Sequence, residues 1–136
     1  MTLRALLSKP AVWWIVAGIA GVIFCFLATN DTVYVATSPP SFDYYVVLRK
    51  LYSVVAFAVV GVPAALARRA EQRSASPAVV GLIVAGYSAF IEVLQYFLDP
   101  PPEGLLWNTV DVACGFLGGV IAALAASRFN KSTKSM

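Results

Sequence analysis

Two carboxylates lie inside apolar runs of the sequence. Glu92 stands in the run that ends near residue 98, and Asp111 stands in the run that follows it. On insertion scales, a charged side chain at the centre of a membrane helix costs roughly 2.5–3.5 kcal/mol, and such side chains usually face protein or water. Two facing carboxylates could act as acid and base, hold a cation or accept hydrogen bonds from a ligand. The elements that carry them must therefore turn both groups away from lipid.

The composition indicates what those elements are. The chain has 136 residues, of which 60% are hydrophobic and 12% are charged, whereas about a quarter of a soluble domain is charged. Four apolar runs have the length of a membrane span, roughly at residues 11–28, 44–67, 78–98 and 105–126. The sequence predicts an all-α membrane protein, a bundle of four transmembrane helices forming a single domain over residues 1–136. The first run is longer than the apolar part of a signal peptide, so we interpret it as an uncleaved span.

The basic residues predict the orientation of these spans. The loops at 29–43 and 99–104 contain acidic residues and no lysine or arginine. Under the positive-inside rule, both termini and the loop at 68–76 lie in the cytoplasm, and we expect a multi-pass protein of the plasma membrane. The net charge of +3 follows from this topology, so we expect no nucleic-acid partner. The residues on the predicted cytoplasmic side are Arg4, Lys9, Arg68, Arg69, Arg73, Arg128, Lys131 and Lys134.

Two cations break that rule and share a depth with the carboxylates. Arg49 and Lys50 lie five or six residues into the second predicted span, on its outer side. Glu92 lies six residues before the outer end of its span, and Asp111 lies six residues after the outer start of the next. At 1.5 Å per residue all four lie about 8–9 Å below the outer surface. Two cations and two anions therefore fall in one layer.

Helical periodicity places polar and small residues on one face of these spans. Two interpretations remain open: a hydrogen-bonded network that fixes helix register, or a polar pocket that opens to the outer leaflet and holds a head group or a sugar. The candidate ligand-binding residues are Arg49, Lys50, Ser53, Glu92, Gln95 and Asp111, and the candidate helix-packing residues are Gly115, Gly118 and Gly119.

Other chemistries are less favoured by the residue types. The chain has no histidine, which removes the usual general base and the commonest metal ligand. Two nearby cations oppose a metal ion between Glu92 and Asp111, so we expect neither a metal nor a cofactor. The thiols of Cys25 and Cys114 lie in separate apolar runs, and we expect them to be free. An enzyme using the two carboxylates as acid and base ranks below a binding protein.

The motifs of the last two spans resemble a known family. Glu92-x-x-Gln95, a proline-rich turn ending in Gly104, and Asp111 followed by Gly118 are similar to the VanZ-like pattern E-x-x-Q, a short loop with Gly-Arg, then D-x-x-x-N-x-x-G. The resemblance covers spans two to four, which is most of the chain.

The second span is similar to the family segment D-K-x-x-H. Lys50 matches the family lysine, whereas Arg49 stands where the family has aspartate and Ser53 where it has histidine. Leu105 replaces the family arginine, and Gly115 replaces the family asparagine. Any family chemistry that needs that histidine or arginine is therefore not expected here.

The resemblance implies an integral protein of the bacterial inner membrane and cell envelope, in a family named for teicoplanin resistance, a form of antibiotic resistance. It fits an outer-leaflet pocket that binds a lipid or a glycopeptide-related ligand. The alternatives are a non-catalytic structural or assembly subunit of a membrane complex and, less favoured, a membrane enzyme acting on a lipid-linked substrate. Expected partners are membrane lipids, together with a membrane-protein partner or a second copy of the chain.

Overall fold

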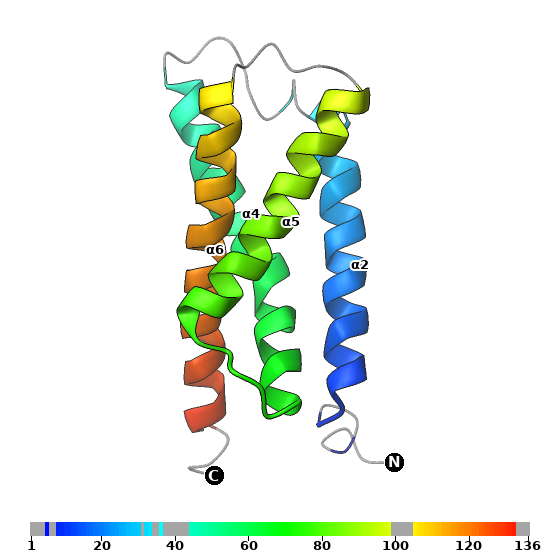
Figure 1. Ribbon diagram of the computed structural model, residues 1–136, viewed down its shortest axis with the longest axis vertical. Helices are drawn as coiled ribbons and strands as arrows, with labels where there is room; N and C mark the ends of the chain where they lie inside the picture. The colour runs from blue at the N-terminus through cyan, green and yellow to red at the C-terminus, as the bar shows by residue number, and fades with distance from the viewer. Residues whose placement is uncertain are drawn as a thin grey trace.

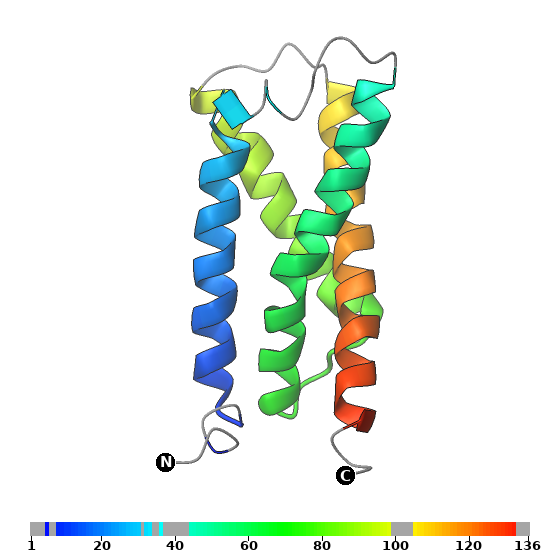
Figure 2. The ribbon, with the colours of Figure 1, turned by 180° about the vertical axis from the view of Figure 1, so that it is seen from behind.

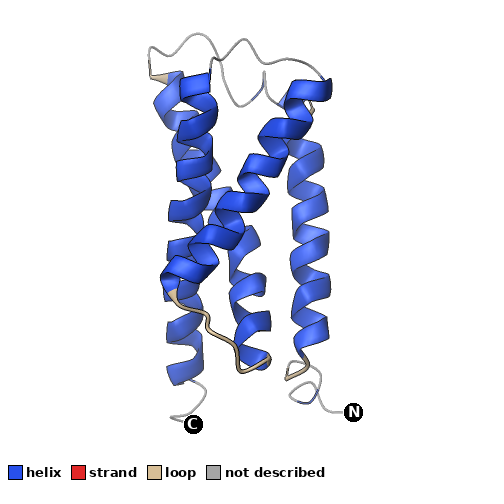
Figure 3. Ribbon diagram, in the orientation of Figure 1, coloured by secondary structure: helices blue, strands red, loops and turns tan. Residues whose placement is uncertain are grey.

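The computed structural model is a bundle of four long α-helices (Figure 1). It describes residues 5, 8–30, 32–33, 36, 44–98 and 105–132. The helices are α2 (Pro10–Ala28), α4 (Tyr45–Ala70), α5 (Pro77–Leu98) and α6 (Leu105–Ser132). Each is long and apolar enough to cross a membrane, and no strand occurs in the described part of the chain (Figure 3). The prediction of an all-α four-helix membrane protein is therefore confirmed.

Two helices extend further than the sequence predicts. α4 was expected to end near Ala67 and α6 near Ala126, but α4 continues to Ala70 and α6 to Ser132. The predicted ends followed the loss of apolar character, which marks the edge of a membrane span and not the end of a helix. Polar residues extend both helices, and the last turn of α4 contains two arginines, whose positive charge interacts favourably with the negative end of a helix.

A turn with defined backbone geometry ends α4. The N–H of Gln72 donates to the carbonyl of Arg69 at 2.9 Å, and the N–H of Arg73 donates to that of Arg68 at 2.9 Å. Gln72 has a φ of 57°, the left-handed conformation that closes this pattern of two bonds, the Schellman motif. Pro77 then begins α5, with the hydroxyl of Ser76 accepting the N–H of Val79 at 3.4 Å, as expected for an N-cap.

The centre of the bundle is the seam where α6 packs against α4 and α5, which we call the glycine seam (Gly61, Gly81, Gly115, Gly118 and Gly119). A Cβ added at Gly118 would lie 2.6 Å from the Cβ of Phe57, and one at Gly119 would lie 2.6 Å from the backbone oxygen of Val80. Only glycine permits so close an approach of the helices.

α2 joins the bundle in a different way. It packs on α4, and Gly21 is its only buried residue. α5 crosses the bundle diagonally, so that it lies near α6 at one end and near α2 at the other (Figures 1 and 2). The Tyr87 hydroxyl donates to the carbonyl of Gly21, and its ring meets Phe57 with centroids 6.3 Å apart.

Candidate functional site

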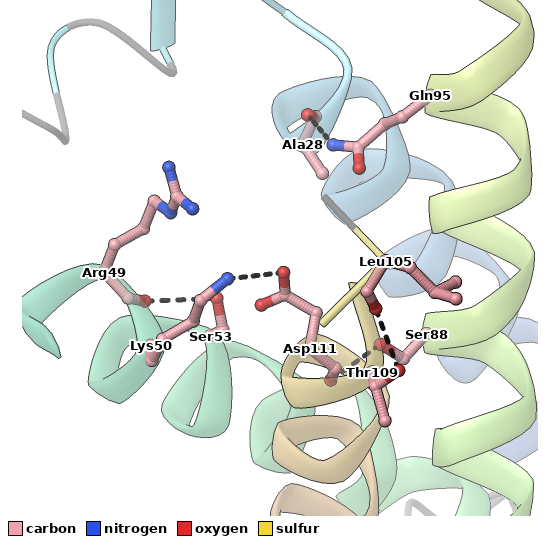
Figure 4. Close-up of polar contacts among 9 residues, drawn as sticks. All are labelled: Ala28, Arg49, Lys50, Ser53, Ser88, Gln95, Leu105, Thr109 and Asp111. Atoms are coloured by element: carbon pink, nitrogen blue, oxygen red, sulfur yellow. Dashed lines mark hydrogen bonds and ion pairs between the residues drawn. The ribbon is translucent and has the colours of Figure 1, made fainter. Parts of the chain in front are cut away.

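Lys50 and Asp111 form an ion pair between α4 and α6 (Figure 4). The Lys50 Nζ lies 2.5 Å from the Asp111 Oδ2, and the two side chains are 10% and 17% exposed. Lys50 is one of two polar residues that are buried in the described part of the chain. Each charge therefore neutralises the other where neither is well hydrated.

The regular geometry of the helices brings the pair to one depth. Lys50 is the sixth residue of α4 and Asp111 is the seventh of α6. Both helices start at the same end of the bundle (Figure 2), so both groups lie about 8–9 Å along their axes. The common layer that the sequence predicts is therefore present for these two residues.

Two further side chains complete the surroundings of the pair. The Nζ of Lys50 lies 5.5 Å from the ring centroid of Trp107, within the range of a cation–π contact. The hydroxyl of Ser88, which is fully buried, donates to the backbone carbonyl of Asp111 at 3.0 Å. Three helices thus meet at this cluster, which we call the polar cluster (Lys50, Ser88, Trp107 and Asp111).

The other candidate residues have different positions. The Arg49 guanidinium lies apart from the Lys50–Asp111 contact (Figure 4), and the Ser53 hydroxyl donates to the Arg49 carbonyl at 3.1 Å within the same helix. The Gln95 amide donates to the carbonyl of Ala28 on α2 at 2.7 Å. Glu92 is half-buried on α5. Of the six predicted residues, Lys50 and Asp111 are joined side chain to side chain, and Ser53 is joined to the backbone of Arg49.

The three candidate packing glycines lie at helix contacts. Gly115 faces α5, where an added Cβ would lie 2.6 Å from that of Ser88. Gly118 faces α4 and Gly119 faces α5. The turns of α6 that follow Asp111 can therefore pack closely against both α4 and α5.

Sequence reasoning places Ser88 on the polar face of its span, together with Glu92 and Gln95, but not among the candidate binding residues, and it does not single out Trp107. Ser88 lies four residues before Glu92, and Trp107 lies four residues before Asp111. Side chains at this spacing share one face of a helix, so the signal was present in the periodicity. Whether either residue touches the ion pair depends on how the helices are rotated, which the sequence does not fix.

The polar cluster holds charge but offers little for catalysis. The ammonium of Lys50 occupies an oxygen of Asp111, which leaves that carboxylate poorly placed to exchange a proton with a substrate. Among the described residues, no group of three or more histidine, cysteine, aspartate or glutamate side chains could hold a metal ion. Cys25 and Cys114 are free thiols, as expected. The arrangement joins α4, α5 and α6 through one ion pair and one hydrogen bond.

Comparisons with protein families, with curated proteins and with solved structures found no match for this chain. The resemblance to the VanZ-like family remains a prediction from the sequence motifs.

Proposed function

We propose that this chain is a VanZ-like multi-pass protein of the cell envelope that binds a lipid or a glycopeptide-related ligand at the polar cluster, without catalysing a reaction. In this proposal the polar cluster lies in the outer leaflet, and both termini and the loop between α4 and α5 lie in the cytoplasm. An anionic or sugar-bearing head group would bind through Lys50, Arg49 and the hydrogen-bonding groups nearby.

One observation carries the proposal: the Lys50–Asp111 pair lies between helices that already pack closely without it. Gly118 of α6 meets the Phe57 side chain of α4, and an added Cβ at Gly61 would lie 2.8 Å from the Cβ of Ala122. Replacing a buried ion pair by apolar residues is often neutral or stabilising. Two charges at a seam that does not need them are therefore candidates for a function other than packing.

The test compares the natural protein with the double variant Lys50→Met/Asp111→Leu in lipid nanodiscs. Both new side chains are apolar and similar in size, so the glycine seam should keep the bundle folded. Native mass spectrometry would identify the amphiphile retained from the source membrane. The proposal predicts a specific ligand on the natural protein that the equally stable double variant lacks. Equal retention by both proteins would reject the polar cluster as its site.

A second candidate is a structural or assembly subunit. It is favoured by α2, which packs on α4 through one side, buries only Gly21 fully, and has an outer side that another helix or lipid can cover. Under this hypothesis the natural protein and the double variant would carry the same stoichiometric protein partner, and neither would carry a specific amphiphile. The same mass spectra therefore separate the two candidate functions.

A further inference from the structure

A second feature lies away from the polar cluster, on the face between α2 and α5. It is an apolar groove of about 590 Å³, which we call the lateral groove. α5 diverges from α2 towards the end where α2 begins (Figure 1). A Cβ added at Gly18 would meet nothing within 4 Å, so this part of the groove is open. Its lining includes Trp14, Gly18, Val22, Ala64, Ile83 and Phe90.

The size and lining of the lateral groove indicate what fills it. Water would find few polar partners there, and apolar cavities stay dry. The α2 residues that line the groove, from Trp14 to Phe26, extend over about 18 Å of helix. A single acyl chain, which is one file of methylenes, can lie along such a groove without needing polar partners.

Charged groups surround the end of the groove beside Trp14. The indole N–H of Trp14 donates to the Glu71 Oε1 at 2.7 Å, and the Arg73 Nε lies 3.8 Å from the other oxygen of the same carboxylate. Arg68 donates to the carbonyl of Ser74, whereas Arg69 donates to the carbonyl of Ala126 on α6. Arg68 and Arg73 against one glutamate give this end a positive excess, and the side chain of Arg73 is 70% exposed.

We propose that an anionic membrane lipid binds at this site, with an acyl chain in the lateral groove over Gly18 and its phosphate-bearing head group beside Arg73. The Schellman turn fixes the backbone of Arg73 at the end of α4, and basic residues near a membrane surface attract anionic lipids. Trp14 lies between the two parts, with its ring in the groove and its N–H at the charged end, as tryptophan does at membrane interfaces. The site is at the opposite end of α4 from Lys50 and does not depend on the polar cluster.

The experiment uses the full chain in nanodiscs of equal parts phosphatidylglycerol and phosphatidylcholine, followed by native mass spectrometry with gradual activation. Gly18→Leu fills the groove, and Gly86→Leu is its matched control. Gly86 is also a helical glycine with nothing within 4 Å of an added Cβ, but it is not part of the groove lining. Val22→Phe, at a lining residue that is 71% exposed, blocks the same space by a second route.

We expect the natural protein and Gly86→Leu to retain one phosphatidylglycerol, and Gly18→Leu and Val22→Phe to lose most of it. Arg73→Gln should lower the preference for phosphatidylglycerol over phosphatidylcholine about fivefold, since a basic residue near the surface contributes roughly 1 kcal/mol. Arg128→Gln, at the exposed end of α6, is the charge control and should change the preference less.

Three outcomes would overturn the proposal. The first is equal lipid retention by Gly18→Leu, Val22→Phe and Gly86→Leu. The second is a natural protein that does not prefer the anionic lipid, or a preference that Arg73→Gln leaves unchanged. The third is a dimer of the natural protein that carries no lipid and that Gly18→Leu separates, which would assign the groove to a second copy of the chain.

Discussion

The two sides of this bundle are built on different principles. On one side, α6 packs against α4 and α5 along the glycine seam, where a single added methyl group would lie 2.6 Å from its neighbours. On the other side, α2 buries one residue and is linked to α5 by hydrogen bonds from Tyr87 and Gln95 to its backbone. The difference shows that apolar content does not measure packing in a membrane protein, because lipid is as apolar as a helix surface. Small residues and polar contacts decide which helices stay together.

Breaking the ion pair on the tight side should have the largest effect. Asp111→Leu removes the carboxylate that lies 2.5 Å from the Lys50 ammonium and leaves that charge in a site where the residue is 8% exposed. We expect a loss of about 3 kcal/mol in the free energy of unfolding. The measurement is reversible unfolding in mixed micelles, followed by circular dichroism. A loss smaller than that from the hydrogen-bond variants Tyr87→Phe and Gln95→Leu, described below, would show that lipid or water compensates the charge of Lys50.

The glycine seam gives the next largest effect. In Gly119→Ala the new Cβ would lie 2.6 Å from the Val80 backbone oxygen and 2.7 Å from the Gly81 Cα, so two helices must separate. We expect a cost of about 1–3 kcal/mol. Gly86→Ala is the matched control, because its Cβ meets nothing and alanine favours a helix by up to about 1 kcal/mol over glycine. In the same assay, Gly119→Ala should lower the free energy of unfolding and Gly86→Ala should raise it. Equal changes would contradict the close approach of α6 to α5.

The hydrogen bonds that link α2 should contribute less. Tyr87→Phe removes the bond to the Gly21 carbonyl while the ring stays in its aromatic cluster. Membrane hydrogen bonds average about 0.6 kcal/mol in mutant cycles, and we expect a loss of that size. Gln95→Leu, which removes the bond to the Ala28 carbonyl, should cost a similar amount. A loss from either variant as large as that from Gly119→Ala would mean that α2 is held as firmly as the other helices.

Much of the fold follows from the sequence, because hydropathy over 20 residues and the positions of proline identify each helix. The helical rise alone then puts Lys50 and Asp111 in one layer. The helical rise does not determine which side chains contact one another, because those contacts depend on the rotation and tilt of each helix. Gln95 illustrates this: it is a candidate binding residue on the same predicted face as Glu92, but α5 leans towards α2 at that end and its amide donates to the Ala28 carbonyl. The lateral groove was not predicted for the same reason, because it arises where two tilted helices diverge.

The decisive measurement is the unfolding free energy of Lys50→Met/Asp111→Leu beside the natural protein and both single variants. If the glycine seam holds the bundle and the ion pair serves binding, the double variant should be as stable as the natural protein or more so, while each single variant is less stable. A double variant that loses as much stability as Asp111→Leu alone would contradict this. The Lys50–Asp111 pair would then be part of the scaffold, and the proposed binding function would lose its main support.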